Sequence, residues 1–205
     1  RVPPRAAWAR AEPLDTGLIQ MTSGTTGKPK AIACPVIALG VAVRAREAAL
    51  PYGASEVEGM NVMFIWEAIR PLCFGHVALV IPDGVIMDTT RLAAFLETHR
   101  ATRILSTPSL LATLLDTAAE ASPSTTRAEV PLRTRLARLS TWLLCGEVVP
   151  SALPMRAAKL LPAVRLVNDY SSWEGSDVSL ALLSSGGSGG SGSSSPCAPI
   201  GRPLQ

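Results

Sequence analysis

The stretch Met21-Thr22-Ser23-Gly24-Thr25-Thr26-Gly27-Lys28-Pro29-Lys30 contains two glycines, four hydroxyl side chains and two lysines. It follows the short apolar run 18–21, so the pattern predicts a strand that leads into a loop. Glycines allow successive backbone N–H groups to converge on an anion, and the hydroxyl and ammonium groups add donors and positive charge. A loop of this composition suits a polyphosphate ligand.

This loop does not fit the P-loop pattern, which places four residues between its first glycine and its Gly-Lys-Ser/Thr sequence. Here Gly24 and Gly27 enclose only two residues, and Pro29 stands where the pattern needs a hydroxyl side chain. Composition alone also fits an ordinary solvated turn, because glycine, serine and threonine are common in loops. The polyphosphate interpretation therefore depends on the order of the residues.

Short apolar runs alternate with helical patterns along the rest of the chain. The runs predict strands at 18–21, 76–81, 102–106, 139–145, 163–168 and 177–183. The helical patterns cover 35–50, 61–74, 88–99 and 151–161, and a further helix is expected to begin at Pro108. This alternation predicts βαβ units, and hence an α/β fold with a mainly parallel sheet and helices on both faces.

Composition narrows the class of protein. The 205 residues are 47% hydrophobic and 17% charged, a balance typical of a globular domain. Scattered arginines give the net charge of +3, and aromatic residues make up only 4%, so nucleic-acid binding is not favoured. The four cysteines form no CxxC pair, and the apolar run 31–43 is too short to span a membrane. We therefore expect a soluble, cytoplasmic protein without a zinc site or a disulfide framework.

The string Thr22–Lys30 closely resembles the phosphate-binding signature of the adenylate-forming superfamily. This superfamily includes adenylation domains of nonribosomal peptide synthetases, acyl- and aryl-CoA ligases, and luciferases. The resemblance implies ATP binding, with a catalytic role for Lys30 and cofactor-binding roles for Thr22, Ser23, Gly24, Thr25, Thr26 and Gly27. The family usually has glycine directly after this string, and this chain has Ala31 there.

A second block, Asn168-Asp169-Tyr170-Ser171-Ser172-Trp173-Glu174, follows a predicted strand, where ligands of parallel sheets gather. It is similar to the family's Asn-x-Tyr-Gly-x-Thr-Glu block. The resemblance implies that Tyr170 lies against adenine, that Asp169 belongs to the nucleotide site, and that Glu174 is a catalytic ligand of Mg²⁺. A packing tyrosine and a solvated carboxylate are the alternatives for Tyr170 and Glu174. Ser171 and Trp173 depart from the family's glycine and threonine.

Two shorter blocks match the same family. The strand-ending sequence Leu143-Leu144-Cys145-Gly146-Glu147 resembles its Gly-Gly-Glu block, which implies that the backbone at Gly146 approaches the nucleotide. The sequence Pro199-Ile200-Gly201-Arg202-Pro203 resembles the turn that follows the nucleotide site in these proteins.

Residues 64–67 resemble the helix that walls the acyl pocket of peptide-synthetase adenylation domains. The resemblance implies a substrate pocket formed by Val62, Met63, Trp66, Trp173 and Asp177. Those domains hold the substrate's α-ammonium group with an aspartate four residues before the tryptophan, where this chain has Val62. A buried ammonium group without a carboxylate is unfavourable, so an ordinary α-amino acid is a doubtful substrate. Asp177 is either a replacement charge partner or a surface residue at the start of a strand.

The resemblance implies ATP- and Mg²⁺-dependent activation of a small carboxylic acid as an acyl-adenylate, in a peptide-synthetase-like or reductase-type enzyme. The acyl acceptor would be a carrier-protein domain or CoA. The matched blocks cover the central part of an adenylation domain without its C-terminal catalytic lobe, so residues 1–205 are expected to be inactive alone. Residues 184–195 are all glycine or serine, which predicts a flexible loop or linker. The alternatives are an acyl- or aryl-CoA ligase fragment and a non-catalytic subdomain that binds nucleotide or a partner.

Overall fold

The computed structural model describes residues 10–22, 27–61, 65–120, 130–172, 176–183 and 196–204. Within them, the main sheet has seven strands in the order β4-β3-β5-β6-β7-β8-β9. Their bounds are β3 Val57–Met60, β4 Val77–Val80, β5 Arg103–Ser106, β6 Thr141–Leu144, β7 Arg165–Ser172, β8 Ser176–Leu183 and β9 Arg202–Pro203. The strands from β4 to β7 pair in parallel, whereas β8 and β9 pair antiparallel, so the prediction of a mainly parallel sheet is confirmed.

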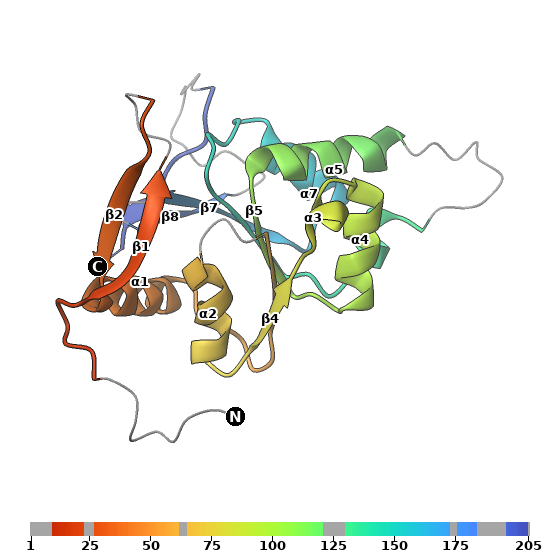
Figure 1. Cartoon of the computed structure of the whole chain (residues 1–205). Helices are drawn as coiled ribbons and strands as arrows, with labels where there is room; N and C mark the ends of the chain where they lie inside the picture. The colour runs from red at the N-terminus through yellow and green to blue at the C-terminus, as the bar shows by residue number, and fades with distance from the viewer. Residues whose placement is uncertain are drawn as a thin grey trace.

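Helices cover both faces of this sheet (Figure 1). Their bounds are α1 Val36–Ala49, α2 Ile65–Cys73, α3 Asp83–Ile86, α4 Thr89–Thr98, α5 Pro108–Glu120, α6 Leu132–Arg135 and α7 Leu153–Leu160. Neighbouring strand residues point to opposite faces. Accordingly, Trp142 of β6 packs in the larger core, with residues of α4, α5 and α7. The next residue, Leu143, packs in a smaller core with Leu39 of α1.

The two ends of the polyphosphate stretch lie on a pair of strands outside the main sheet. Strand β1 (Thr16–Thr22) pairs antiparallel with β2 (Lys30–Pro35), and Lys30 lies opposite Thr22. The predicted strand at 18–21 is therefore present, but its expected place in the parallel sheet is wrong. The pattern gave no signal for β2, because its apolar residues run directly into helix α1 and look like part of the helix.

The structure differs from the predictions in two further strands, β3 and β7, which both carry charged residues. The sequence did not predict strand β3. A buried strand is expected to be apolar, but β3 contains the buried Glu58 next to Gly59. Strand β7 continues to Ser172, so the start of the block predicted to follow a strand lies within it. This extension is stabilised by pairing with β8, whose Ser179 lies opposite Tyr170.

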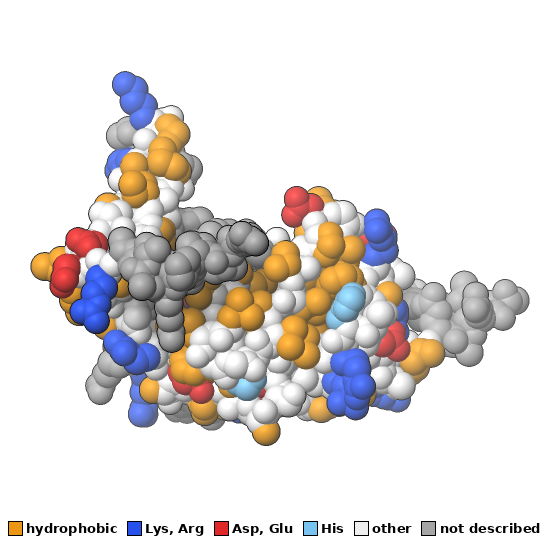
Figure 2. Space-filling model, turned by 60° about the horizontal axis from the view of Figure 1, so that its bottom comes forward, with side chains coloured by type: hydrophobic (Ala, Val, Ile, Leu, Met, Phe, Trp, Pro, Cys, Tyr) orange, Lys and Arg blue, Asp and Glu red, His pale blue; other side chains and the backbone are white. Residues whose placement is uncertain are grey.

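The surface carries several large exposed hydrophobic side chains, including Met21 on β1, Leu72 on α2 and Val80 on the edge strand β4. On the face shown in Figure 2, hydrophobic side chains gather toward the middle, and most Lys and Arg side chains lie toward the two ends. No helix in the described part of the chain is both long and apolar enough to cross a membrane.

Candidate functional site

The carboxyl end of the central strands brings two of the matching blocks together. The Asn168 side chain of β7 donates a hydrogen bond from Nδ2 to the Pro199 carbonyl oxygen, at 2.9 Å. On the neighbouring strand, the Ser179 hydroxyl donates to the Ile200 carbonyl oxygen at 2.7 Å. These two bonds hold the segment 199–203 against the strand pair that carries Tyr170. The blocks are about thirty residues apart in the sequence, and the fold makes them neighbours.

Four features of the described residues fit a nucleotide. Gly27 has φ +78°, a conformation that favours glycine, and the space where a Cβ would lie is open. The side chains of Lys28 and Lys30 are exposed near the start of β2. The Tyr170 side chain is partly accessible, with 48% of the residue's surface exposed, so it can offer a ring to a base. Gly146, directly after β6, also has positive φ, +81°.

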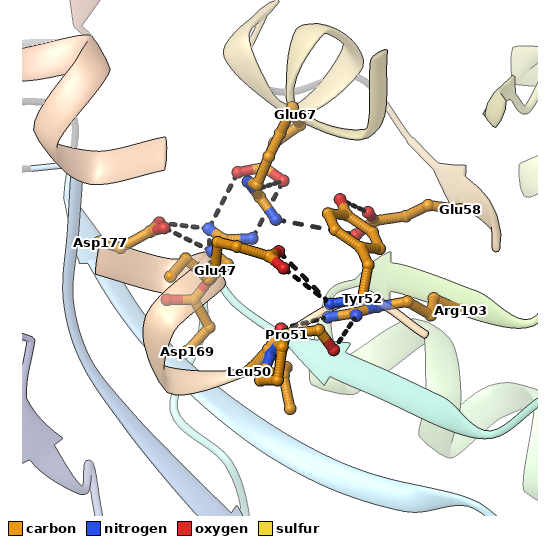
Figure 3. Close-up of polar contacts among 11 residues, drawn as sticks. Glu47, Leu50, Pro51, Tyr52, Glu58, Glu67, Arg103, Asp169 and Asp177 are labelled. Carbon is orange, nitrogen blue, oxygen red and sulfur yellow. Dashed lines mark hydrogen bonds and ion pairs between the residues drawn. The ribbon is translucent and has the colours of Figure 1, made fainter. Parts of the chain in front are cut away.

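A buried cluster of four charged residues lies beside these strands. Arg46 of α1 donates from Nη1 and Nη2 to the two carboxylate oxygens of Glu67 on α2, at 3.1 and 2.9 Å. It also donates from Nε and Nη2 to Asp177 of β8. Asp169 of β7 forms an ion pair with Nη2 at 2.7 Å. We call these four residues the Arg46 cluster, and all four side chains are at most 3% exposed. Figure 3 shows its three acids, Glu67, Asp169 and Asp177.

The charged contacts continue away from the Arg46 cluster. Arg70 pairs with Glu67 and lies 3.8 Å from the Glu58 carboxylate. Glu58 accepts a hydrogen bond from the Tyr52 hydroxyl, and the guanidinium of Arg103 lies over the Tyr52 ring, 4.4 Å from its centre. Arg103 also donates to the backbone carbonyl oxygens of residues 50 and 51. A continuous line of polar contacts thus runs from β8 to the amino ends of β3 and β5.

Burial and charge set the protonation states in this region. Four carboxylates face three guanidinium groups, so one negative charge is uncompensated when all are ionised. Burial raises the pKa of Asp169 to about 7, Arg46 opposes this shift, and the nearby carboxylates of Asp177 and Glu67 add to it. Although burial lowers the pKa of Arg46, the carboxylates of Asp169, Glu67 and Asp177 raise it well above its usual value.

Cys145 directly follows β6 and directly precedes Gly146. Burial, supported by the negative charge of Asp169, raises the pKa of this thiol to about 12. The thiolate is the nucleophilic form of cysteine, so burial disfavours the reactive form of Cys145. We assign it to the smaller core, where it packs with Leu143 and Val167.

The predicted site residues divide into three groups. Asp169 and Asp177 are brought together by Arg46, so the alternative of a surface position for Asp177 is wrong. Gly27, Lys30, Gly146 and Tyr170 are accessible, as a nucleotide site requires. The remaining predicted residues or their side chains lie outside the described part of the structure: Thr22, Ser23, Gly24, Thr25, Thr26, Val62, Met63, Trp66, Trp173 and Glu174.

A metal site is not visible in the described part. No group of three or more His, Cys, Asp or Glu side chains in it could hold a metal ion. The predicted magnesium ligand, Glu174, is outside the described residues, so its role stays a prediction.

Sequence reasoning missed Arg46 and Glu67 as members of the site. Arg46 is one of two arginines on a helix of mostly small and apolar residues, and it is the buried one. Glu67 directly follows the predicted pocket residue Trp66. Arg44 and Glu47 lie on the same helix, so no signal in the sequence indicates that Arg46, and not Arg44, is buried with carboxylate partners.

Comparison with known proteins points to the same family as the matching blocks. The family described as "AMP-binding enzyme" matches residues 4–204. Glycine betaine reductase ATRR of Emericella nidulans is 35% identical over 161 residues, which cover 78% of this chain and 12% of that protein. Malpinin synthetase of Mortierella alpina is 29% identical over 207 residues, covering 98% of this chain and 2% of the synthetase.

Solved structures share the fold. The Vibrio cholerae adenylation domain AlmE, in complex with glycyl-adenosine-5'-phosphate, superimposes with a TM-score of 0.71 at 22% identity, covering 95% of this chain and 34% of that chain. The structure of McyG A-PCP complexed with phenylalanyl-adenylate gives 0.76 at 16% identity, covering 98% and 33%. The chain therefore spans about a third of these structures and a smaller share of the two relatives.

Proposed function

The chain belongs to the family of AMP-binding enzymes, and we propose that it is the central part of an adenylation domain that activates a carboxylic acid with ATP. The observation that carries the proposal is the contact between two matching blocks. Asn168 and Ser179 hold the 199–203 segment beside the strand that presents Tyr170. Both blocks resemble nucleotide-site segments of the adenylate-forming superfamily, so their meeting at one sheet end supports a nucleotide site there.

In the proposed reaction, a carboxylate oxygen of the substrate forms a bond to the α-phosphorus of ATP. The bond from that phosphorus to the bridging oxygen breaks, and pyrophosphate leaves with the electron pair. The products are an acyl-adenylate and pyrophosphate. No proton is transferred, so the protein's task is to orient two anions and to reduce their repulsion.

Different residues of this chain would bind the phosphates, the adenine and the metal ion. Lys30 and the hydroxyl groups of Ser23, Thr25 and Thr26 would bind the β- and γ-phosphates, and Tyr170 would orient the adenine. Glu174 would hold Mg²⁺, which supplies positive charge to the phosphates when it is bound. The positive φ of Gly27 and the exposure of Lys30 support this arrangement, because both residues are accessible to a ligand.

The acid is proposed to lack a primary α-ammonium group. Val62 replaces the aspartate that such a group would need, and Asp177 is already bound by Arg46. The relative named glycine betaine reductase suggests a betaine as one candidate. A quaternary ammonium group has no N–H, so it does not need a hydrogen-bonding carboxylate.

A carrier-protein domain is the proposed acyl acceptor, because the similar McyG structure is named as an A-PCP pair. CoA is the alternative acceptor. The second candidate function is a non-catalytic nucleotide-binding subdomain, which the departures Ser171 and Trp173 favour.

Acid-dependent exchange of pyrophosphate into ATP tests the proposal in the full-length protein that carries this chain. Glycine betaine, glycine and 3,3-dimethylbutanoate, an isostere of the betaine with carbon in place of the quaternary nitrogen, form a suitable first set of acids. We expect at least one acid without a primary α-ammonium group to stimulate exchange. Lys30→Ala should reduce ATP affinity about 10- to 100-fold, because charged hydrogen bonds to phosphate are lost.

The control is Lys159→Ala, which removes an exposed lysine of α7 that belongs to none of the matched blocks. It should leave the exchange unchanged. ATP binding without exchange for any acid in a broad panel would contradict acid activation and favour the non-catalytic alternative.

A further inference from the structure

Arg46 connects three elements that are far apart in the sequence. Its guanidinium reaches Glu67 on α2, Asp169 on β7 and Asp177 on β8, which lies 131 residues away along the chain. Arg46 makes two hydrogen bonds to Glu67, two to Asp177 and one ion pair with Asp169. Figure 3 shows Glu67, Asp169 and Asp177 converging on one region from three sides.

Each of these acids is next to, or close to, a residue of the proposed reaction site. Glu67 directly follows Trp66, which belongs to the proposed acid pocket. Asp169 directly precedes Tyr170, the proposed adenine contact. Asp177 begins the described side chains of β8, three residues after the proposed magnesium ligand Glu174. Arg46 thus lies where the acid-binding and nucleotide-binding elements meet.

We propose that Arg46 is a positioning residue for acid activation, which fixes strands β7 and β8 of the nucleotide site against helix α2 of the acid pocket. The inference rests on the proposed function, because it assigns Arg46 to that same site. Arg46 is 1% exposed, and its guanidinium group is bound by the three acids. It acts through Glu67, Asp169 and Asp177.

The shape of the guanidinium group makes this role specific to arginine. Nε and Nη2 bind one carboxylate, and Nη1 and Nη2 bind another. The planar fork therefore fixes the orientation of two acids relative to each other, as well as their distance. A lysine would keep the positive charge, but its single nitrogen cannot bind two carboxylates in this bidentate manner.

The cluster is poorly explained as a device for stability alone. Burying charges costs free energy, and apolar residues of similar volume often replace a buried ion pair without loss of stability. Neither carboxylate oxygen of Asp169 accepts a hydrogen bond from the described part of the chain. The cluster has three acids for one arginine, and one of the acids is held only by an ion pair. The geometry that it imposes explains such a cluster more readily than stability does.

The test compares Arg46→Lys with the wild type in the full-length protein, by acid-dependent pyrophosphate exchange. We expect kcat to fall about 10- to 100-fold, because displacement of two reactants relative to each other has effects of this size. The KM values for ATP and for the acid should change less, about threefold at most, because each binding element keeps its own contacts. A loss confined to kcat distinguishes positioning from loss of a binding contact.

Arg103→Lys is the matched control. Arg103 is as deeply buried as Arg46, but it donates to the backbone carbonyl oxygens of residues 50 and 51 and stacks on Tyr52. It contacts none of the three acids that Arg46 binds in the described structure. The control should lower the melting temperature and leave kcat close to the wild-type value.

Asp177→Asn is the second variant, and it guards against a failure of Arg46→Lys to fold. It weakens the contact between Arg46 and β8 and removes one negative charge. We expect kcat to fall in this variant too. Wild-type kcat in a folded Arg46→Lys or Asp177→Asn protein would overturn the role of Arg46. The role would also be overturned if Arg103→Lys lowered kcat as much as Arg46→Lys does, in proteins with the same loss of melting temperature. No exchange in the wild type with any acid would overturn the proposed function itself, and with it this role.

Discussion

Asp169 is a buried carboxyl group whose protonation should depend on pH in the neutral range. The groups that face it are Arg46 on α1, Asp177 on β8, Glu67 and Arg70 on α2, and the Cys145 thiol after β6. Its pKa rises from 3.8 to about 7, chiefly because burial disfavours the charged form. Between these values the folded state binds more protons than the unfolded state. This group therefore lowers stability as pH rises from about 4 to 7 and has a constant effect above 7.

The variant Asp169→Asn tests this dependence, because its side chain does not titrate. The free energy of unfolding of the variant minus that of the wild type should increase with pH between about 4 and 7. The slope should be at most about 1.4 kcal/mol per pH unit, the value for one proton. Urea unfolding of the chain at several pH values measures the difference. A difference that does not vary with pH would show that Asp169 is ionised throughout.

Glu174 provides a second prediction at the residue scale. A carboxylate is a preferred ligand of Mg²⁺, whereas an amide oxygen carries no negative charge. We expect Glu174→Gln to raise the Mg²⁺ concentration for half-maximal pyrophosphate exchange by about tenfold or more. Titration of Mg²⁺ at saturating ATP measures this concentration. An unaltered magnesium dependence would remove Glu174 from the site.

Among the elements, helix α4 has a side-chain cap at its start. The Asp88 carboxylate accepts hydrogen bonds from the backbone N–H groups of Thr90 and Arg91, at 3.0 and 3.1 Å. These donors have no partner within the helix, so Asp88→Ala should lower the free energy of unfolding by about 1 kcal/mol. Asp88→Asn should cost much less, because asparagine caps helices equally well. Equal losses in the two variants, measured by urea unfolding, would show that the charge matters and the cap does not.

Some elements could be predicted from the sequence because their signals are local. Strand β5 and helix α5 have apolar runs and a proline at the helix start, and both lie within a few residues of their expected bounds. Strand β2 could not be separated from α1, since a hairpin strand is defined by its partner. The extension of β7 to Ser172 likewise depends on pairing with β8, a contact that the sequence pattern does not reveal.

At the scale of the whole molecule, the parallel sheet could be predicted, but the Arg46 cluster could not. Alternating strand and helix patterns suffice for the sheet, because right-handed βαβ connections allow few arrangements. Burial of Arg46 depends on acids 21 and 131 residues away, and no local pattern encodes such a contact. The candidate nucleotide residues were found through ordered motifs, which carry more information than composition.

The most direct test of the account is a calorimetric titration of ATP into the purified 205-residue chain, with and without Mg²⁺. Circular dichroism should first establish that the chain is folded. We predict weak, saturable binding that Mg²⁺ strengthens and that Lys30→Ala abolishes or greatly weakens. A folded chain that binds no ATP at millimolar concentration would contradict the central claim, that these residues form the nucleotide site of an acid-activating enzyme.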